Sequence, residues 1–144
     1  MRRWATLLFL ALGLAVVARA AEPDLHLSGK KVRDEVTAVV TAQLAALKAG
    51  DFAAAYSHAA AGIRRQFDAR VFALLIKRGY APLLKQVAVD LGVVRDDGDH
   101  VANVVVTVTD SLNRSTVYRY WLVREDRWRI SGVVLDQKPP RGDI

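Results

Sequence analysis

Two side chains in this sequence could carry a proton to or from a substrate. Asp90 lies inside the apolar run 87–94, and a carboxyl group in an apolar pocket has a raised pKa that suits general acid or base catalysis. His58 lies close in sequence to Tyr56, whose hydroxyl could donate a hydrogen bond. Asp90 also has a simpler interpretation as a strand residue that faces solvent. No complete catalytic set accompanies these residues, so the sequence favours a protein without enzymatic activity and leaves an isomerase or dehydratase as the alternative.

Metal and cofactor chemistry has little support in the residue types. The chain has no cysteine, which excludes thiol catalysis, iron–sulfur clusters and cysteine-zinc sites. Its histidines, His26, His58 and His100, are far apart in sequence, whereas a metal site needs three or four converging ligands. The acidic segment 96–99 has the composition of a hairpin turn and lacks the spaced ligands of a calcium loop. We therefore expect neither a metal nor a cofactor.

Residues 1–20 have the composition of a secretory signal peptide. An arginine pair precedes the apolar run 4–18, and Ala18 and Ala20 supply the small residues that a signal peptidase reads. The alternative is an uncleaved membrane anchor, but the apolar run is shorter than the roughly 20 residues that a spanning helix needs. We expect cleavage after residue 20, a secreted or periplasmic protein, and no membrane contact after cleavage.

The charge of the mature chain excludes one class of partner. The formal net charge of the whole chain is +6, and three arginines leave with the leader, so +3 is left. The charges that stay alternate in sign along the sequence, whereas nucleic-acid binding favours a clustered basic stripe. We therefore expect no nucleic-acid partner.

The N-terminal half of the mature chain has helical periodicity. We expect a flexible lead-in over 21–31 and helices over 32–49, 52–61 and 69–78. Gln43 is placed largely off the apolar face of the first helix. That face carries Val32, Val36, Val39, Val40, Leu44 and Leu47.

The C-terminal half changes to a period of two, which predicts strands over 85–94, 101–110, 116–124 and 127–135. The connections between them are short, as in antiparallel hairpins. Gly132 in the last strand predicts a bulge or bend. We expect one α+β domain over 32–136, with helices packed on a curved four-stranded antiparallel sheet, and a disordered tail over 137–144.

Short sequence motifs in a fixed order resemble a known family. Gly50-Asp51, Ala55-Tyr56 and the sheet ending 127–132 resemble the nuclear-transport-factor-2-like (cystatin-like cone) superfamily. The chain is more narrowly similar to an uncharacterised bacterial family, a domain of unknown function. The residues that carry this narrower similarity are Gly50, Asp51, Phe52, Ala55, Tyr56, Ile63, Phe67, Phe72, Gly79, Tyr80, Ala81 and Pro82.

The resemblance implies a ligand pocket between the helices and the concave sheet face. Such pockets are mostly apolar and contain a few polar groups that orient the ligand. The pocket candidates are Tyr56, His58, Tyr80, Arg119, Trp121 and Trp128. Each has an alternative interpretation, because buried tyrosines usually fill a core and Arg119 fits an interface or solvent equally well.

The strand 116–124 is apolar on both of its faces, which is typical of a strand that is covered on both sides. The helices supply one cover, and a second copy of the chain is the candidate for the other. Three hypotheses follow from the sequence. The first is a non-catalytic module that binds a small apolar or amphipathic ligand or a partner protein. The second is a homodimeric assembly domain, and the third is an isomerase or dehydratase.

Overall fold

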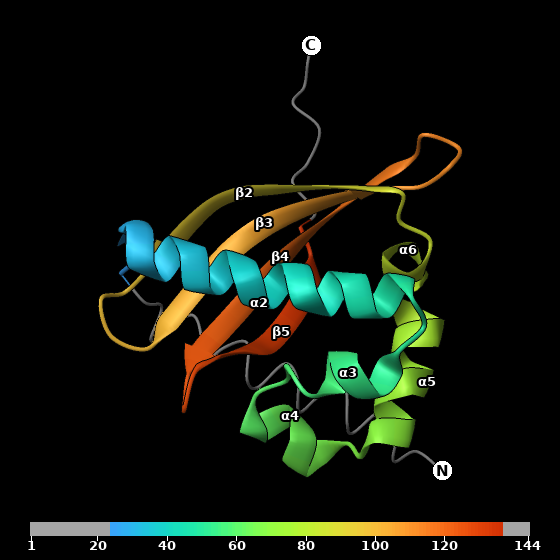
Figure 1. Cartoon of the computed structure of the whole chain (residues 1–144), viewed down its shortest axis with the longest axis horizontal. Helices are drawn as coiled ribbons and strands as arrows, with labels where there is room; N and C mark the ends of the chain where they lie inside the picture. Colours follow the sequence, from blue (N-terminus) through green and yellow to red (C-terminus); the bar gives the residue numbers. More distant parts are fainter. Residues whose placement is uncertain (1–23, 137–144) are drawn as a thin grey trace, which may run out of the picture.

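An antiparallel sheet of five strands forms one layer of the molecule, and helices cover one of its faces (Figure 1). The computed structural model describes residues 24–136, so the expected leader (1–20) and tail (137–144) lie outside the described residues. The spatial order of the strands follows the sequence. The strands are β1 (His26–Leu27), β2 (Ala88–Asp96), β3 (Val101–Thr109), β4 (Ser115–Arg124) and β5 (Trp128–Leu135).

The helices precede the four long strands in the chain, which confirms the expected α+β class. The longest helix, α2, crosses the sheet, α3 lies beside it, and α5 packs against α3 (Figure 1). Asp51 caps α3 and Asp68 caps α5, each by accepting a hydrogen bond from a backbone N–H of the first turn. The helices are α2 (Lys30–Lys48), α3 (Phe52–Tyr56), α4 (Ala61–Gln66), α5 (Ala69–Gly79) and α6 (Ala81–Leu84).

The sheet has five strands, so the prediction of four was wrong. The additional strand, β1, comes from the segment that the sequence indicated as a flexible lead-in, and it pairs antiparallel with β2. Ser28 extends this pairing, because its N–H donates to the Val94 carbonyl at 3.0 Å and its hydroxyl donates to the buried Asp96 carboxylate. A two-residue strand has no periodicity of its own, and its position depends on these tertiary contacts.

The segment expected to be one helix over 52–61 is interrupted after Tyr56. The backbone at 58–60 instead forms a parallel bridge with β5, where Ile130 N–H donates to the His58 carbonyl at 2.8 Å. Ala60 N–H in turn donates to the Ile130 carbonyl at 2.8 Å. β5 is an edge strand of the sheet, and its free backbone groups pair with residues 58–60. These residues therefore do not continue the helix. Gly62, which directly follows the helix expected over 52–61, lies inside α4.

Two irregularities in strand pairing interrupt the sheet. The register of β4 against β5 shifts between Trp121 and Leu122, which leaves Ser131 as the extra residue and confirms the bulge expected beside Gly132. The register of β2 against β3 shifts between Leu91 and Val94. Bulges bend the bulged strand and increase its twist, so these two positions favour a curved sheet.

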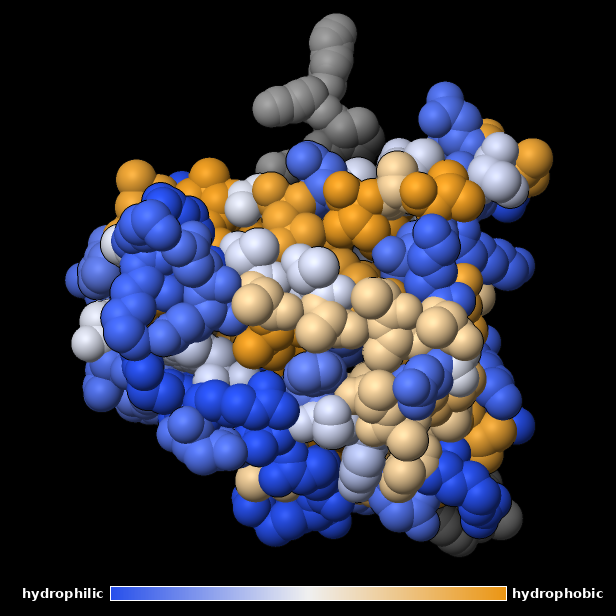
Figure 2. All heavy atoms as spheres, viewed as in Figure 1, coloured by the Kyte–Doolittle hydropathy of each residue, from blue (hydrophilic) through white to orange (hydrophobic). Residues whose placement is uncertain are grey.

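The two faces of the sheet differ in burial, and we call them the inner face, toward the helices, and the outer face. On the inner face of β4, Tyr118, Tyr120 and Leu122 are almost completely buried. On its outer face, Arg119 and Trp121 are only partly buried. Figure 2 shows hydrophobic residues along the β2 edge, where Val87, Val89 and Val93 are exposed. Within residues 24–136, no helix has both the length and the apolar character to cross a membrane.

Candidate functional site

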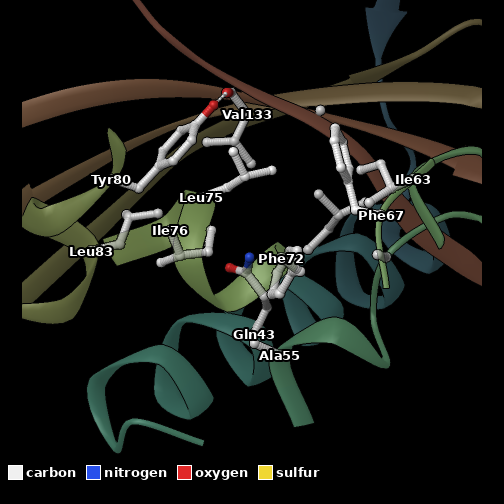
Figure 3. Close-up of a pocket in the computed structure, with 13 residues that line it drawn as sticks. Gln43, Ala55, Ile63, Phe67, Phe72, Leu75, Ile76, Tyr80, Leu83 and Val133 are labelled. Carbon is white, nitrogen blue, oxygen red and sulfur yellow. Dashed lines mark hydrogen bonds between the residues drawn. The ribbon is translucent and has the colours of Figure 1, made fainter. Parts of the chain in front are cut away.

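A cavity of about 150 Å³ lies between the inner face of the sheet and the helices. Its walls come from α2, from the short helices α3 to α6 and from β5 (Figure 3). The wall is almost entirely apolar, and Leu75, which is 41% exposed, lies where the cavity wall meets solvent. The lining residues are Gln43, Ala55, Ala59, Ile63, Phe67, Phe72, Leu75, Ile76, Tyr80, Leu83, Ile130, Gly132 and Val133.

Two polar side chains line this cavity, and both are neutral near pH 7. The Tyr80 hydroxyl donates to the Val133 carbonyl at 2.8 Å, and burial raises the pKa of Tyr80. Gln43 is only 4% exposed, and its amide points into the space that the other side chains surround (Figure 3). The cavity can therefore bind an apolar molecule and offer it a few hydrogen bonds, but it offers no charge from a side chain of residues 24–136.

The amide of Gln43 is only partly satisfied. Its Oε1 accepts a hydrogen bond from the Tyr120 hydroxyl at 2.8 Å, and burial strongly raises the pKa of Tyr120, which keeps that hydroxyl protonated. Its Nε2 forms no hydrogen bond with residues 24–136 and is open to the cavity, whereas the fully buried side-chain atom that lacks a partner in this part of the chain is Nε1 of Trp128. Because buried polar groups are nearly always paired in folded proteins, an unpaired amide donor at the wall of an apolar cavity marks a position for a ligand atom or a water.

Tyr80 is the pocket candidate from the sequence that lines the cavity. Tyr56 lies behind the wall, where its ring packs against Phe72 with centroids 5.3 Å apart. The Tyr56 hydroxyl donates to the Phe67 carbonyl at 2.6 Å and so fixes the turn between α4 and α5. Tyr56 therefore supports two aromatic residues of the wall from outside the cavity.

His58 lies in the turn after α3 and belongs to a different surface. Its Nδ1 lies 3.5 Å from Nη1 of Arg127, and the backbone carbonyl of the neighbouring Ser57 accepts from both Arg127 and Arg129. Burial and the two guanidinium groups lower the pKa of His58. A histidine held neutral beside two arginines is poorly suited to donate a proton, and this one does not line the cavity.

Trp128 fills the opposite end of the inner face. It is 3% exposed, and the guanidinium carbon of Arg124 lies 4.7 Å from the centroid of its ring. Residues of the first turns of α2, including Lys31 and Glu35, lie beside it in a shallow surface depression. Trp128 therefore serves the core and a cation–π contact, and the cavity lies elsewhere.

Arg119 and Trp121 lie on the outer face of the sheet. Arg119 Nη2 lies 3.3 Å from Oδ2 of Asp136, and Trp121 stands opposite Asn103 of β3. Asp90 is on the same outer face, exposed, in register with Thr107. The sheet thus separates Asp90 from the cavity, and Asp90 and His58 do not face a common point.

The cavity depends on residues that sequence reasoning passed over, Gln43 above all. The sequence pattern predicted Gln43 off the apolar face of α2, but the structure buries it. Position 43 follows Val36 by seven residues and Val40 by three, so two turns of helix return it to the buried face. A polar residue at a buried helical position is the signal that could have identified it.

Metal binding finds no support in the part of the chain that the structure describes, where no three His, Asp or Glu side chains form a cluster able to hold an ion. No curated protein and no solved structure matches the chain. The family model described as a domain of unknown function, DUF4864, matches residues 30–142, and the chain therefore belongs to this family.

Proposed function

We propose that this protein is an exported, non-catalytic module that binds a small, mostly apolar molecule in the cavity between its helices and its sheet. The observation that supports this proposal is the cavity itself, about 150 Å³ of space with apolar walls between the helices and β5. An apolar cavity of about this size accommodates a molecule as large as benzene. Typical pockets for drug-sized ligands are at least about twice as large, so the ligand, or the part of it that enters, is small.

The fold supports the same proposal. We infer that the domain is a nuclear-transport-factor-2-like cone, because the helices come first in the chain and cover one face of an antiparallel sheet with two register shifts. In such an arrangement a pocket between helices and sheet is expected. Many functions use a shared fold, so the cavity and its lining, not the fold, determine the kind of ligand proposed here.

A titration with small probes tests the proposed binding. Toluene, cyclohexanone and methylenecyclohexane would each be added to the purified protein, and the methyl NMR signals would be followed. Binding in the cavity should shift the signals of Ile63, Ile76 and Val133, which line it, and leave Val36 in the packed core unchanged. Ala59→Leu, which adds a larger side chain at the wall, should abolish the shifts. Absence of any saturable shift with all three probes would refute the proposal.

Export is supported by the composition of residues 1–20, and it has a separate test. The protein would be expressed with its own leader in a bacterial host and recovered from the periplasm or medium. Its intact mass should correspond to a chain that starts at Ala21. Full-length protein recovered from the cytosol, with Met1 present, would contradict the cleaved leader.

The outer face of the sheet favours a second candidate function, self-assembly. Partly exposed apolar side chains cover the central strands there, and Arg119, paired to Asp136, lies among them, opposite Val105. Two copies that meet through these faces would remove this apolar area from water. The apolar side chains are Val101, Val105, Val117, Trp121 and Val123. Light scattering over a range of concentrations should show a dimer mass, which Trp121→Glu converts to a monomer; a monomer at every concentration excludes the homodimer.

A further inference from the structure

We infer that the ligand of this cavity is a neutral molecule that presents a hydrogen-bond acceptor, such as a carbonyl oxygen, to Nε2 of Gln43. This inference rests on the proposed binding function and assigns the chemical class of the ligand. Only 4% of the surface of Gln43 is exposed, and Figure 3 shows its amide directed into the cavity. Its Nε2 lacks an acceptor among residues 24–136.

The contact with Tyr120 decides which end of the amide faces the ligand. Tyr120 is fully buried, and within the described residues its hydroxyl has Gln43 as its hydrogen-bond partner, at 2.8 Å from Oε1. If the amide were turned over, Nε2 would donate to the hydroxyl oxygen, and the proton of Tyr120 would lose its acceptor. Leaving a buried donor unpaired is costly, so the orientation with Oε1 toward Tyr120 is favoured. The amide N–H group is therefore what the cavity offers.

An unpaired donor at this depth selects against two kinds of ligand. A hydrocarbon, or the methyl end of an acyl chain, fills the volume but leaves Nε2 without a partner. A carboxylate supplies an acceptor, but no cation from residues 24–136 lines the cavity, and an unpaired charge in an apolar site is strongly disfavoured. A neutral ketone, ester, lactone or amide satisfies Nε2 and keeps its remaining surface against the apolar wall.

The apolar wall also limits where the ligand body lies. Ile76, Phe72 and Leu83 are buried side chains around Gln43, whereas Leu75 is 41% exposed. The carbonyl end of the ligand therefore lies deep, next to the amide, and its apolar body extends toward Leu75. This places the polar atom of the ligand away from water, where its hydrogen bond to Nε2 faces little competition.

A matched pair of probes tests the acceptor. Cyclohexanone and methylenecyclohexane have nearly the same shape, and only the ketone accepts a hydrogen bond. Dissociation constants for both would be measured by NMR titration in the wild-type protein and in Gln43→Met. The two probes differ in hydration, but this difference is the same for every variant. A change in the ratio of their affinities between two variants therefore reports the contact with the amide. Loss of one hydrogen bond should lower the ketone preference by about three- to tenfold in Gln43→Met.

Two further variants guard against a structural effect of the substitution. Gln43→Met/Tyr120→Phe removes both hydrogen-bonding groups, so no buried hydroxyl is orphaned, and its ketone preference should be as low as in Gln43→Met. Tyr120→Phe keeps the amide but removes the donor that orients it, and the preference should lie between wild type and Gln43→Met. Saturable binding of both probes with the same affinity ratio in all four proteins would overturn the acceptor and leave the proposed function intact. If neither probe binds the wild-type protein, the binding function is refuted and this inference with it.

Discussion

The two halves of the inner face are packed differently. Under α2, the side chains of Val36, Val40, Val104 and Leu122 are completely buried and belong to one continuous core. Toward α4 and α5 the same face borders the cavity. The long helix presents a regular row of side chains to the sheet, whereas the shorter elements around the cavity change direction at several turns. Close packing depends on side chains that interlock along an element, so the interrupted half leaves space that the continuous half does not.

The largest expected effect is a contrast between two leucines, one from each half. Leu122→Ala removes a fully buried side chain from the packed half and should lower the free energy of unfolding by about 2–5 kcal/mol. Leu75→Ala alters a side chain that is 41% exposed at the cavity, and it should cost less than about 1 kcal/mol. Urea denaturation of both variants measures the contrast, and equal losses would mean that the two halves are packed alike.

Filling the cavity should remove the difference between the halves. Ala59 is buried and lines the cavity, so Ala59→Leu should raise the free energy of unfolding by about 0.5–2 kcal/mol. The matched control is Ala53→Leu, which makes the same change at an exposed position of α3 and should shift stability by less than about 0.5 kcal/mol. Thermal unfolding of the three proteins gives the comparison. A destabilised Ala59→Leu would show that the cavity cannot accept the added carbons.

The wall of the cavity depends on the start of α5, and a cap substitution tests this. Asp68 accepts a hydrogen bond from Val71 N–H at 2.9 Å in the first turn of the helix. Asp68→Ala should lower the free energy of unfolding by about 1 kcal/mol, while Asp68→Asn, which retains the accepting oxygen, should cost less. Hydrogen exchange of α5 amides should accelerate in the alanine variant and stay unchanged in α2. Equal acceleration in both helices would show that they unfold as a single unit.

The smallest expected effect concerns the hairpin between β4 and β5, outside both halves. The bidentate contact with Arg129 lowers the pKa of Asp126 from 3.8 to about 2. Since the pKa is depressed in the folded state, the contribution of this pair is complete above about pH 3.8 and is lost as the pH falls through about 2. Between pH 5 and pH 2, the free energy of unfolding measured by denaturation should therefore fall less steeply in Asp126→Asn than in wild type. Identical profiles would assign no role to this exposed pair.

Much of the fold was predictable, because local periodicity is strong where elements are long. Alternating β-branched residues located β3 and β4 to within one residue at each end, and heptad-like spacing located α2. Membership of an uncharacterised family was also expected from the motif order and is confirmed. The two-residue β1 and the break between α3 and α4 were not predicted, because backbone pairing with distant strands fixes both.

The candidate site was less predictable than the fold. Six aromatic and charged residues were candidates because of their chemistry, yet Tyr80 lines the cavity while Arg119 and Trp121 lie across the sheet from it. Alternation along β4 indicated that the two sets of side chains point to opposite faces, but not which face the helices would cover. That choice depends on how α2 packs, and α2 carries Gln43 to the buried side.

The sequence by itself determined the class of the fold, the order of its elements and the absence of thiol chemistry, since periodicity and residue type act locally. Only the tertiary structure decided that a cavity exists and that Gln43 lines it. A cavity is the volume that side chains from several distant elements fail to fill, and whether an amide is paired depends on which other described residues folding brings next to it. Both properties belong to groups of residues brought together by folding, so neither can be read from any single segment of the chain.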